Sequence, residues 1–406
     1  MSFRFPATYR SSSQSKRIAA FGLAVVLISP SAFANWRAVP AVGAGLEYDD
    51  NINLNVNTGP DTSVNGYVLD AAVDLVNRSQ VSEFKFTPRV LLSRYDESNL
   101  DADNYFANLN YRYTGQRSTF RVWSIYGDEA VRTAEQSVVD FNVDNPDQIP
   151  EDNSGRTFGI ANRKRIQFRP EWSYQAGERS LIELGIDYID VAYDNSVALS
   201  LSDYDQLTST AAYSYNFSPR SAFRLSGYYR KNHFDLMDRD LSGYGAALGV
   251  SHSISERSRL QINVGMDSTE NDLGDNNNSA IGDISLVTDL ETSRILAAYR
   301  RSVVGSGNGV LQLRDSLNLN YTHQVTERFS IGGGVSAYHA TAVGDNTTNL
   351  DRNYYQIRAM FAWHFTRKLS LELDYRYTNI DRAIEAGSAE ANRANLWFRY
   401  QALRQQ

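Results

Sequence analysis

The sequence predicts an all-β fold, a transmembrane antiparallel β-barrel of about eighteen strands that follows a cleaved signal peptide. Three observations predict it: a three-part export leader, recurrent alternation of apolar and polar residues, and tight turns that alternate with long polar connections. The composition agrees, because 25 tyrosines and 18 phenylalanines far exceed 4 methionines, and aromatic residues favour strands. The alternative is a barrel of about sixteen strands, with one hairpin fewer.

Residues 1–34 have the pattern of a secretory signal peptide. A basic leader comes first, an apolar run follows at 18–28, and the segment SAFA at 31–34 offers a cleavage site between small residues. The apolar run is about eleven residues long, whereas a membrane helix needs about twenty. We therefore expect 1–34 to be removed and 35–406 to form the barrel.

The strands are marked by period-two alternation, which puts one side-chain type on each face. At 166–174, for example, Ile166, Phe168 and Trp172 alternate with Gln167 and Arg169. The predicted strands lie near 39–48, 64–76, 82–95, 104–114, 119–128, 163–175, 180–193, 204–217, 222–234, 242–254, 259–270, 279–290, 293–303, 310–323, 329–341, 353–365, 369–381 and 393–401.

The connections between these strands are of two kinds. Short ones read TGQRS at 114–118, AGERS at 176–180, SPRS at 218–221 and SERS at 255–258, as expected of hairpin turns. Between them lie long acidic segments rich in Asn, Asp and Gly, of which 128–162 is the longest. Tight turns on one side and long loops on the other are typical of outer-membrane barrels, and they place both termini on the tight-turn, periplasmic side.

A soluble propeller or sandwich would also show alternation and hairpins. The export leader argues against it, and so does the last strand, NLWFRY at 395–400, which alternates, ends in an aromatic residue and resembles the insertion signal of outer-membrane proteins. Aromatic pairs near tight turns suit an interfacial girdle. These pairs are Tyr111-Tyr113, Tyr213-Tyr215 and Tyr375-Tyr377. The predicted location is the outer membrane of a Gram-negative bacterium, with membrane lipid, lipopolysaccharide and the barrel-assembly machinery as partners.

The polar face of a membrane barrel must line the lumen, because the apolar face meets lipid. The predicted pore-lining cations are Lys85, Arg89, Arg112, Arg121, Arg165, Arg169, Arg224, Arg230, Arg358 and Arg376. They have two interpretations: pairing with acids on neighbouring strands, which stiffens the wall, or contact with carboxylates or phosphates of a passing solute. Asp315 would point at lipid, so we expect a β-bulge near Arg314.

The long connection 128–162 is a candidate constriction. It carries the acidic residues Glu135, Asp140, Asp144 and Asp147. Folded inward, it would narrow the pore and set these acids against the arginine wall; folded outward, it would be a surface flap. Composition leaves both arrangements open.

Enzyme chemistry has little support in the sequence. The chain lacks a G-x-S-x-G elbow, an H-E-x-x-H motif and a phosphate-binding glycine loop, and its five histidines fall on different predicted strands. A Ser–His pair on the barrel wall would escape sequence reasoning. No cofactor or metal site is expected, and a net charge of −7 argues against a nucleic-acid partner.

The mature start, VGAGLEYDDNINL at 42–54, resembles the opening of outer-membrane β-barrel porins that are associated with exopolysaccharide synthesis and export systems. The resemblance implies a passive barrel for a secreted polysaccharide, polysaccharide-export partners and no catalytic residue. The main hypothesis is therefore polysaccharide export, with Arg89, Arg112, Arg169 and Arg224 among the contacts. The alternatives are a general or anion-preferring diffusion porin, and a plugged structural or adhesive barrel. The oligomeric state stays open.

Overall fold

The structure is a computed structural model. It describes residues 36–56, 63–132, 161–194, 201–270, 276–343, 351–382 and 387–402. The predicted signal peptide at 1–34 lies outside the described residues and stays a prediction. Within the described ranges, no helix combines the length and the apolar character needed to cross a bilayer.

Eighteen antiparallel strands form a single sheet. They are β1 (Trp36–Asp49), β2 (Val64–Arg78), β3 (Ser82–Tyr95), β4 (Ala102–Thr114), β5 (Ser118–Ala130), β6 (Asn162–Gln175), β7 (Ser180–Tyr193), β8 (Tyr204–Ser218), β9 (Ser221–Phe234), β10 (Arg239–Ser255), β11 (Ser258–Glu270), β12 (Asn276–Asp289), β13 (Ser293–Ser306), β14 (Val310–Gln324), β15 (Phe329–Ala342), β16 (Arg352–His364), β17 (Leu369–Arg382) and β18 (Ser388–Gln401). Two short 3₁₀ helices, η5 (Ser98–Leu100) and η7 (Asp235–Met237), lie in connections between strands.

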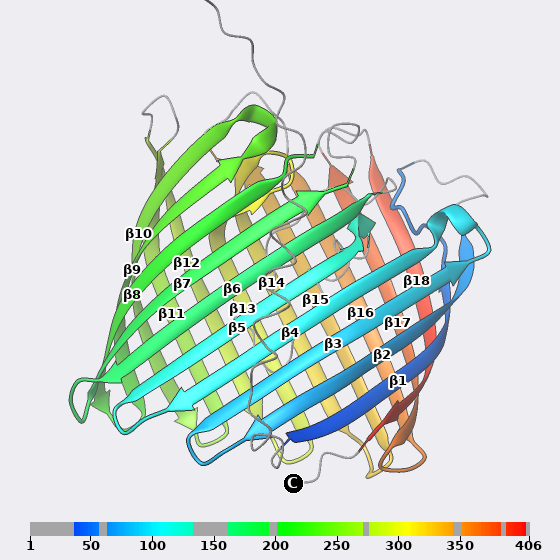
Figure 1. The fold of residues 1–406 in the computed structure, drawn as a ribbon, viewed down its shortest axis with the longest axis horizontal. Coiled ribbons are helices and arrows are strands. Elements are labelled where there is room, and N and C mark those ends of the chain that lie inside the picture. Colours follow the sequence, from blue (N-terminus) through cyan, green and yellow to red (C-terminus); the bar gives the residue numbers. More distant parts are fainter. Residues whose placement is uncertain are drawn as a thin grey trace, which may run out of the picture.

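The sheet closes on itself, because each strand pairs with its neighbours in sequence and β1 also pairs with β18. Closure leaves no free sheet edge, which a strand-built membrane protein requires. The strands run at a tilt around the barrel, with short turns at the lower end and longer connections at the upper end (Figure 1). Trp36 pairs with Asn77 beside the β2–β3 turn, and Gln401 bonds to the β16–β17 turn, so both described ends lie on the tight-turn side.

The prediction of eighteen strands is confirmed, and the sixteen-strand alternative is wrong. The errors lie at the long-loop ends: β12 begins at Asn276 instead of 279, and β18 begins at Ser388 instead of 393. Here the strands continue above the apolar belt with only polar residues or alanine, so the large apolar side chains that mark the alternation are missing. Tyr375 and Tyr377, which the sequence placed near a tight turn, lie instead in the outer half of β17.

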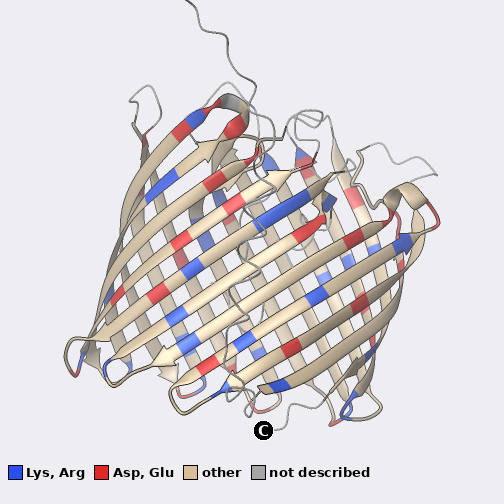
Figure 2. Cartoon of the chain, in the orientation of Figure 1, with Lys and Arg blue, Asp and Glu red and all other residues tan. Residues whose placement is uncertain are grey.

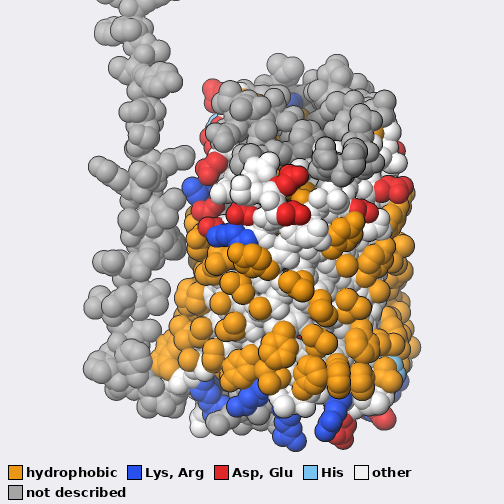
Figure 3. All heavy atoms as spheres, turned by 90° about the vertical axis from the view of Figure 1, so that its right-hand side faces the viewer, with side chains coloured by type: hydrophobic (Ala, Val, Ile, Leu, Met, Phe, Trp, Pro, Cys, Tyr) orange, Lys and Arg blue, Asp and Glu red, His pale blue; other side chains and the backbone are white. Residues whose placement is uncertain are grey.

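The outer surface carries the apolar face of every strand. Leu46, Leu184, Leu248 and Val264 are among the many large apolar side chains that remain exposed. They form a broad belt around the barrel, with acidic side chains above it and basic ones below on the face shown in Figure 3. Aromatic residues flank the belt at the outer and the tight-turn level. At the long-loop edge of the belt they include Tyr48, Tyr67, Tyr105, Tyr229 and Tyr244. At the tight-turn edge they include Phe120, Trp172, Trp363 and Phe398. The chain is thus an outer-membrane β-barrel of a Gram-negative bacterium.

The predicted β-bulge near Arg314 is absent, since β14 keeps a regular register with both neighbours. Asp315 does point outward. Arg301 on β13 neutralises it through an ion pair of 2.8 Å, and the hydroxyl of Tyr299 donates to the same carboxylate. Tyr299 marks the upper edge of the apolar belt, so this charge pair lies at headgroup level, where a bulge is unnecessary.

Candidate functional site: the barrel lumen

All ten predicted cations lie on the inward face, opposite to the exposed apolar side chains. The register connects them across the wall: Arg112 faces Arg121, which faces Glu171, and Trp123 faces Arg169. Basic and acidic positions are interspersed over the strands (Figure 2). A role of these ten side chains in permeation stays a prediction.

Seven of the ten predicted cations form ion pairs with acids of the wall. The bond of Arg89 to Asp70 is bidentate, with Nε and Nη2 donating over 2.7 and 3.0 Å. The others are Lys85–Asp74 at 3.1 Å, Arg169–Asp187 at 2.5 Å, Arg230–Asp267 at 3.2 Å, Arg358–Asp374 at 2.5 Å, Arg376–Asp374 at 3.8 Å, and Arg224–Glu183. For these residues the geometry favours the stiffened-wall interpretation, because a paired guanidinium has fewer donors left for a solute.

Two glycines explain part of the opening sequence at 42–54. Gly43 on β1 lies in register between Asp70 and Arg399, and Arg399 reaches across it to Asp70 at 3.2 Å. A Cβ at Gly43 would come within 3.3 Å of Arg399, and one at Gly45 would lie 2.8 Å from the ring of Trp397. The missing side chains therefore let Arg399 and Trp397 lie over β1 and tie the closing seam together.

The outer half of the lumen contains apolar clusters on the inward face. The largest comprises Val131, Ala161, Ile189, Val191, Tyr193, Leu201, Tyr204, Phe234, Leu241, Val303 and Leu311. A second comprises Leu54, Tyr338, Ala340, Tyr354, Ile380, Ala389 and Ala391. Water is excluded from these clusters because segments beyond the strand ends pack inward against the wall.

One inward segment is the tip of the β13–β14 hairpin. The pairing of β12 with β13 ends at Gly282–Arg301, whereas β13 and β14 continue together to Ser306–Val310. The freed tip lies against the inner face of β8 and β9. The backbone N–H of Ser202 donates to the Gly307 carbonyl over 2.7 Å, and Arg230 donates to the Val303 carbonyl over 3.3 Å.

The sequence analysis missed this hairpin tip, because it ended one strand at 303, began the next at 310 and left the residues between them as a long-loop connection. A signal was present, since Val303-Val304 and Val310-Leu311 are consecutive apolar residues on both sides of the turn. Such runs indicate burial on both faces, which alternation at the lipid boundary does not produce.

A second inward segment follows β1. Its turn is held by Asn51, whose side-chain amide donates to the carbonyls of Asn55 and Glu390, each at 2.9 Å. Arg382 donates to the Leu54 carbonyl over 3.3 Å, and Leu54 packs beside the stacked rings of Tyr338 and Tyr354. The acidic–Asn turn of the opening motif thus covers the inner face of β15–β18.

The long connection 128–162 is described only at its two ends. Val131 joins the largest apolar cluster beside Ala161. The Arg132 guanidinium donates to the Leu100 carbonyl and lies over the Tyr95 ring at 5.4 Å, and burial lowers the pKa of Arg132. Both ends therefore enter the lumen. Glu135, Asp140, Asp144 and Asp147 lie outside the described residues, so the constriction stays a prediction.

The periplasmic half of the lumen contains an unusual pair. Arg112 and Arg121 stand directly opposite each other on β4 and β5, and both are exposed to the lumen. Among the described residues neither has an ion pair or hydrogen bond, since Glu83 pairs with Arg78 and Glu171 stays beyond ion-pair distance. Opposed like charges destabilise a sheet, so this pair is expected to attract anions.

Two Ser–His contacts occur on the outward face near the tight turns. Ser221 Oγ lies 2.8 Å from His252 Nδ1, and Ser293 Oγ lies 2.7 Å from His323 Nδ1. No described carboxylate contacts either ring, and no described group of three potential ligands could bind a metal. A nucleophile also needs an oriented base and an oxyanion site, so these contacts carry no argument for catalysis.

The chain matches no protein-family model and no curated protein in sequence. Solved structures with a similar barrel include two from Pseudomonas aeruginosa. OccK2 (OpdF) in complex with glucuronate has a TM-score of 0.47 and 11% identity over 90% of this chain and 98% of that chain. OpdQ has a TM-score of 0.46 and 10% identity over 91% of this chain and 99% of that chain. The outer membrane channel DcaP of Acinetobacter baumannii has a TM-score of 0.42 and 13% identity over 90% of this chain and 96% of that chain. At these values, function must be argued from the lumen itself.

Proposed function

We propose that the barrel is a porin-type diffusion channel that prefers small anions. The observation that carries the proposal is the charge of the inward face. The inward-facing cations of the strands include Lys85, Arg89, Arg112, Arg121, Arg163, Arg165, Arg169, Arg224, Arg230, Arg259, Arg294, Arg300, Arg314, Arg352, Arg358, Arg376, Arg382, Arg393 and Arg399. The acids of the described strands that face the same way are Glu47, Asp49, Asp70, Asp74, Glu83, Glu129, Glu171, Glu183, Asp187, Asp267, Asp283, Asp289, Glu372 and Asp374. Cations outnumber acids although the whole chain is acidic.

This excess favours anions because rings of basic side chains select the sign of the permeating ion. The unpartnered Arg112 and Arg121 add to the effect, since their guanidinium donors remain available to a carboxylate or phosphate.

Polysaccharide export has weaker support than the porin alternative. Of its four expected contacts, Arg89, Arg169 and Arg224 pair with acids of neighbouring strands, and Arg112 alone has no such partner among the described residues. Segments packed into the outer half also narrow the space for a polymer chain. A solute of a few ångströms passes such a lumen more readily than a continuous polymer does.

The test is a planar-bilayer recording on the refolded mature chain, with the reversal potential measured in a salt gradient. We expect open channels with anion preference, and R112E/R121E should shift the reversal potential toward cations. The matched control is R328E/R367E, which makes the same charge change in tight turns away from the wall and should shift it little. Absent conductance would favour the plugged structural barrel, and equal shifts in both variants would contradict the role of the arginine pair.

A further inference from the structure

The tight-turn rim repeats one backbone hydrogen bond around its circumference. In each case the backbone N–H of a residue at a strand end donates to the backbone carbonyl of the last residue of the neighbouring turn that comes earlier in the chain. The bonds are Thr114 to Val81, Gln175 to Arg117, Asn216 to Arg179, Ser253 to Arg220, Asp289 to Arg257, Gln324 to Thr292, His364 to Arg328 and Gln401 to Lys368, all at 2.7–2.8 Å. Six of the eight acceptors are Arg or Lys. The repeat therefore fixes a cationic residue at the same position of most turns.

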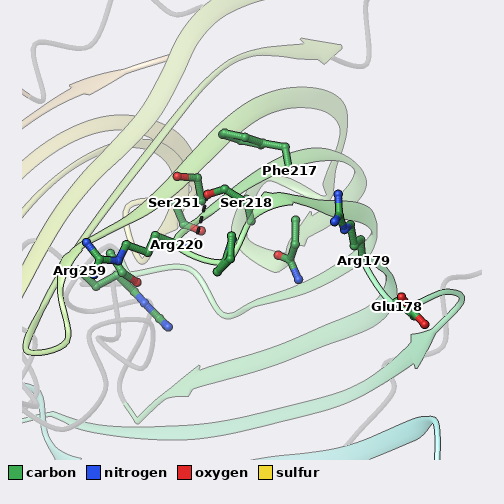
Figure 4. A pocket seen from close by; sticks show the side chains of 12 residues that line it. Glu178, Arg179, Phe217, Ser218, Arg220, Ser251 and Arg259 are labelled. Atoms are coloured by element: carbon green, nitrogen blue, oxygen red, sulfur yellow. Dashed lines mark hydrogen bonds between the residues drawn. The ribbon is translucent and has the colours of Figure 1, made fainter.

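Two of these cations, Arg179 and Arg220, join Arg259 of β11 around a pocket of about 360 Å³ (Figure 4). Asn216, Ser218, Ser251 and Ser253 add amide and hydroxyl groups to its lining. The register irregularities of this region fall beside the pocket, at Asn216/Ser218 and Ser253/Ser255. Bulges bend a strand away from its neighbour, which opens space at a rim.

The charge in this pocket is not compensated. The guanidinium groups of Arg179, Arg220 and Arg259 have no ion pair or hydrogen bond among the described residues, and the bond to Ser218 Oγ comes from the backbone N–H of Arg220. Glu178, the one acid in the lining, has no ion pair either. The next rim cation differs, because Arg257 pairs with Glu291 at 3.2 Å. Three arginines with hydroxyl donors beside them match the oxygens and the negative charge of a phosphate group.

We propose that this rim pocket is a binding site for a phosphate group at the periplasmic mouth of the channel. Asn216, Ser251 and Arg259 occupy inward-facing register positions, so the pocket opens toward the lumen entrance. The phosphate can belong to a free periplasmic compound or to a phospholipid headgroup of the inner leaflet. The site goes beyond the proposed function, because binding here does not require that the barrel conduct.

The experiment titrates inorganic phosphate into the mature barrel in phosphatidylcholine nanodiscs and measures the affinity by ³¹P NMR. R179Q/R220Q/R259Q should weaken binding at least tenfold. The matched control, R117Q/R328Q/R367Q, removes the same charge from equivalent turns outside the pocket and should change affinity by less than about twofold. Native gel mobility and heat-modifiability of each variant verify that the barrel has folded.

Equal weakening in both variants would overturn the proposal in favour of a diffuse cationic rim, and so would unchanged binding in the pocket variant. A second arm repeats the titration with phosphatidylglycerol in the nanodiscs. Competition that disappears in the pocket variant identifies a lipid headgroup as the source; no competition identifies a free compound. The bilayer recordings are independent of this readout, so failure here leaves the channel proposal standing.

Discussion

The outer and periplasmic halves of the lumen obey the same alternation but place their charges in different environments. In the outer half, Arg163 and Glu129 form an ion pair of 2.9 Å with side chains only 2% and 5% exposed. In the lower half, the Arg224 and Glu183 side chains form an ion pair but remain 38% and 32% exposed. The difference arises because inward-packed segments cover the outer wall, whereas the described tight turns leave the lower wall open to water.

This comparison indicates that the two halves have different tasks. Buried, paired charges rigidify the outer half, and the cost of breaking such a pair is large. Exposed charges in the lower half are screened by solvent and individually contribute little to stability, but they remain available to solutes. We therefore expect stability to be concentrated in the outer half and, under the proposed function, ion selection to take place in the periplasmic half.

The largest expected effect separates the halves by stability. Arg163→Ala leaves the Glu129 carboxylate buried without this partner, which should cost about 3–5 kcal/mol of the free energy of unfolding. The matched Arg224→Ala in the exposed lower half, where the partner Glu183 is itself exposed, should cost only about 1 kcal/mol or less. Urea unfolding in liposomes measures both. Similar losses in the two variants would contradict the distinction.

A second variant addresses the hairpin tip. Gly305 packs against Tyr204, and a Cβ there would lie 3.2 Å from the ring. Gly305→Leu should therefore detach the β13–β14 tip, at an overpacking cost of about 1–3 kcal/mol. The single-channel conductance should rise because the outer lumen widens. Gly333→Leu on the lipid-facing side of β15 is the control, and a conductance unchanged by Gly305→Leu would show that the tip does not limit flow.

The smallest expected effect is a pH dependence of the outer half. Asp203, just before β8, accepts a bond of 2.8 Å from the Tyr193 N–H. Burial, together with the nearby Asp235, Asp190 and Asp194, raises the pKa of Asp203. The folded barrel thus holds this proton more tightly than the unfolded chain, so the stability it contributes is present in acid and is lost as the pH rises through the raised pKa.

Asp203→Asn keeps an acceptor oxygen and removes the charge. Its unfolding temperature should exceed that of the wild type at pH 7, and the difference should shrink as the pH falls through the raised pKa of Asp203. Asp103→Asn, which removes an acid paired with Arg94, is the control and should lower stability at pH 7. A difference for Asp203→Asn that is constant with pH would refute the assignment.

The sequence by itself determined the strand number, the strand positions over the apolar belt and the face of each wall residue. These follow from period-two alternation, which is local: one side must meet lipid, so Arg112 or Arg169 can be assigned to the inner face without a structure. The tight-turn signature likewise placed the two described ends of the barrel on one side.

Only the tertiary structure decided which of these charges are available. Arg89 and Arg112 carry the same signal in sequence, yet Asp70 neutralises the first and no described residue pairs with the second. The sequence gives no sign of the rim pocket, and the apolar pairs at 303–304 and 310–311 indicate that the hairpin tip is buried but not what it contacts. Each depends on contacts between residues distant in the chain, set by the closing register and by the inward packing of the connections, and alternation along one strand carries no information about them.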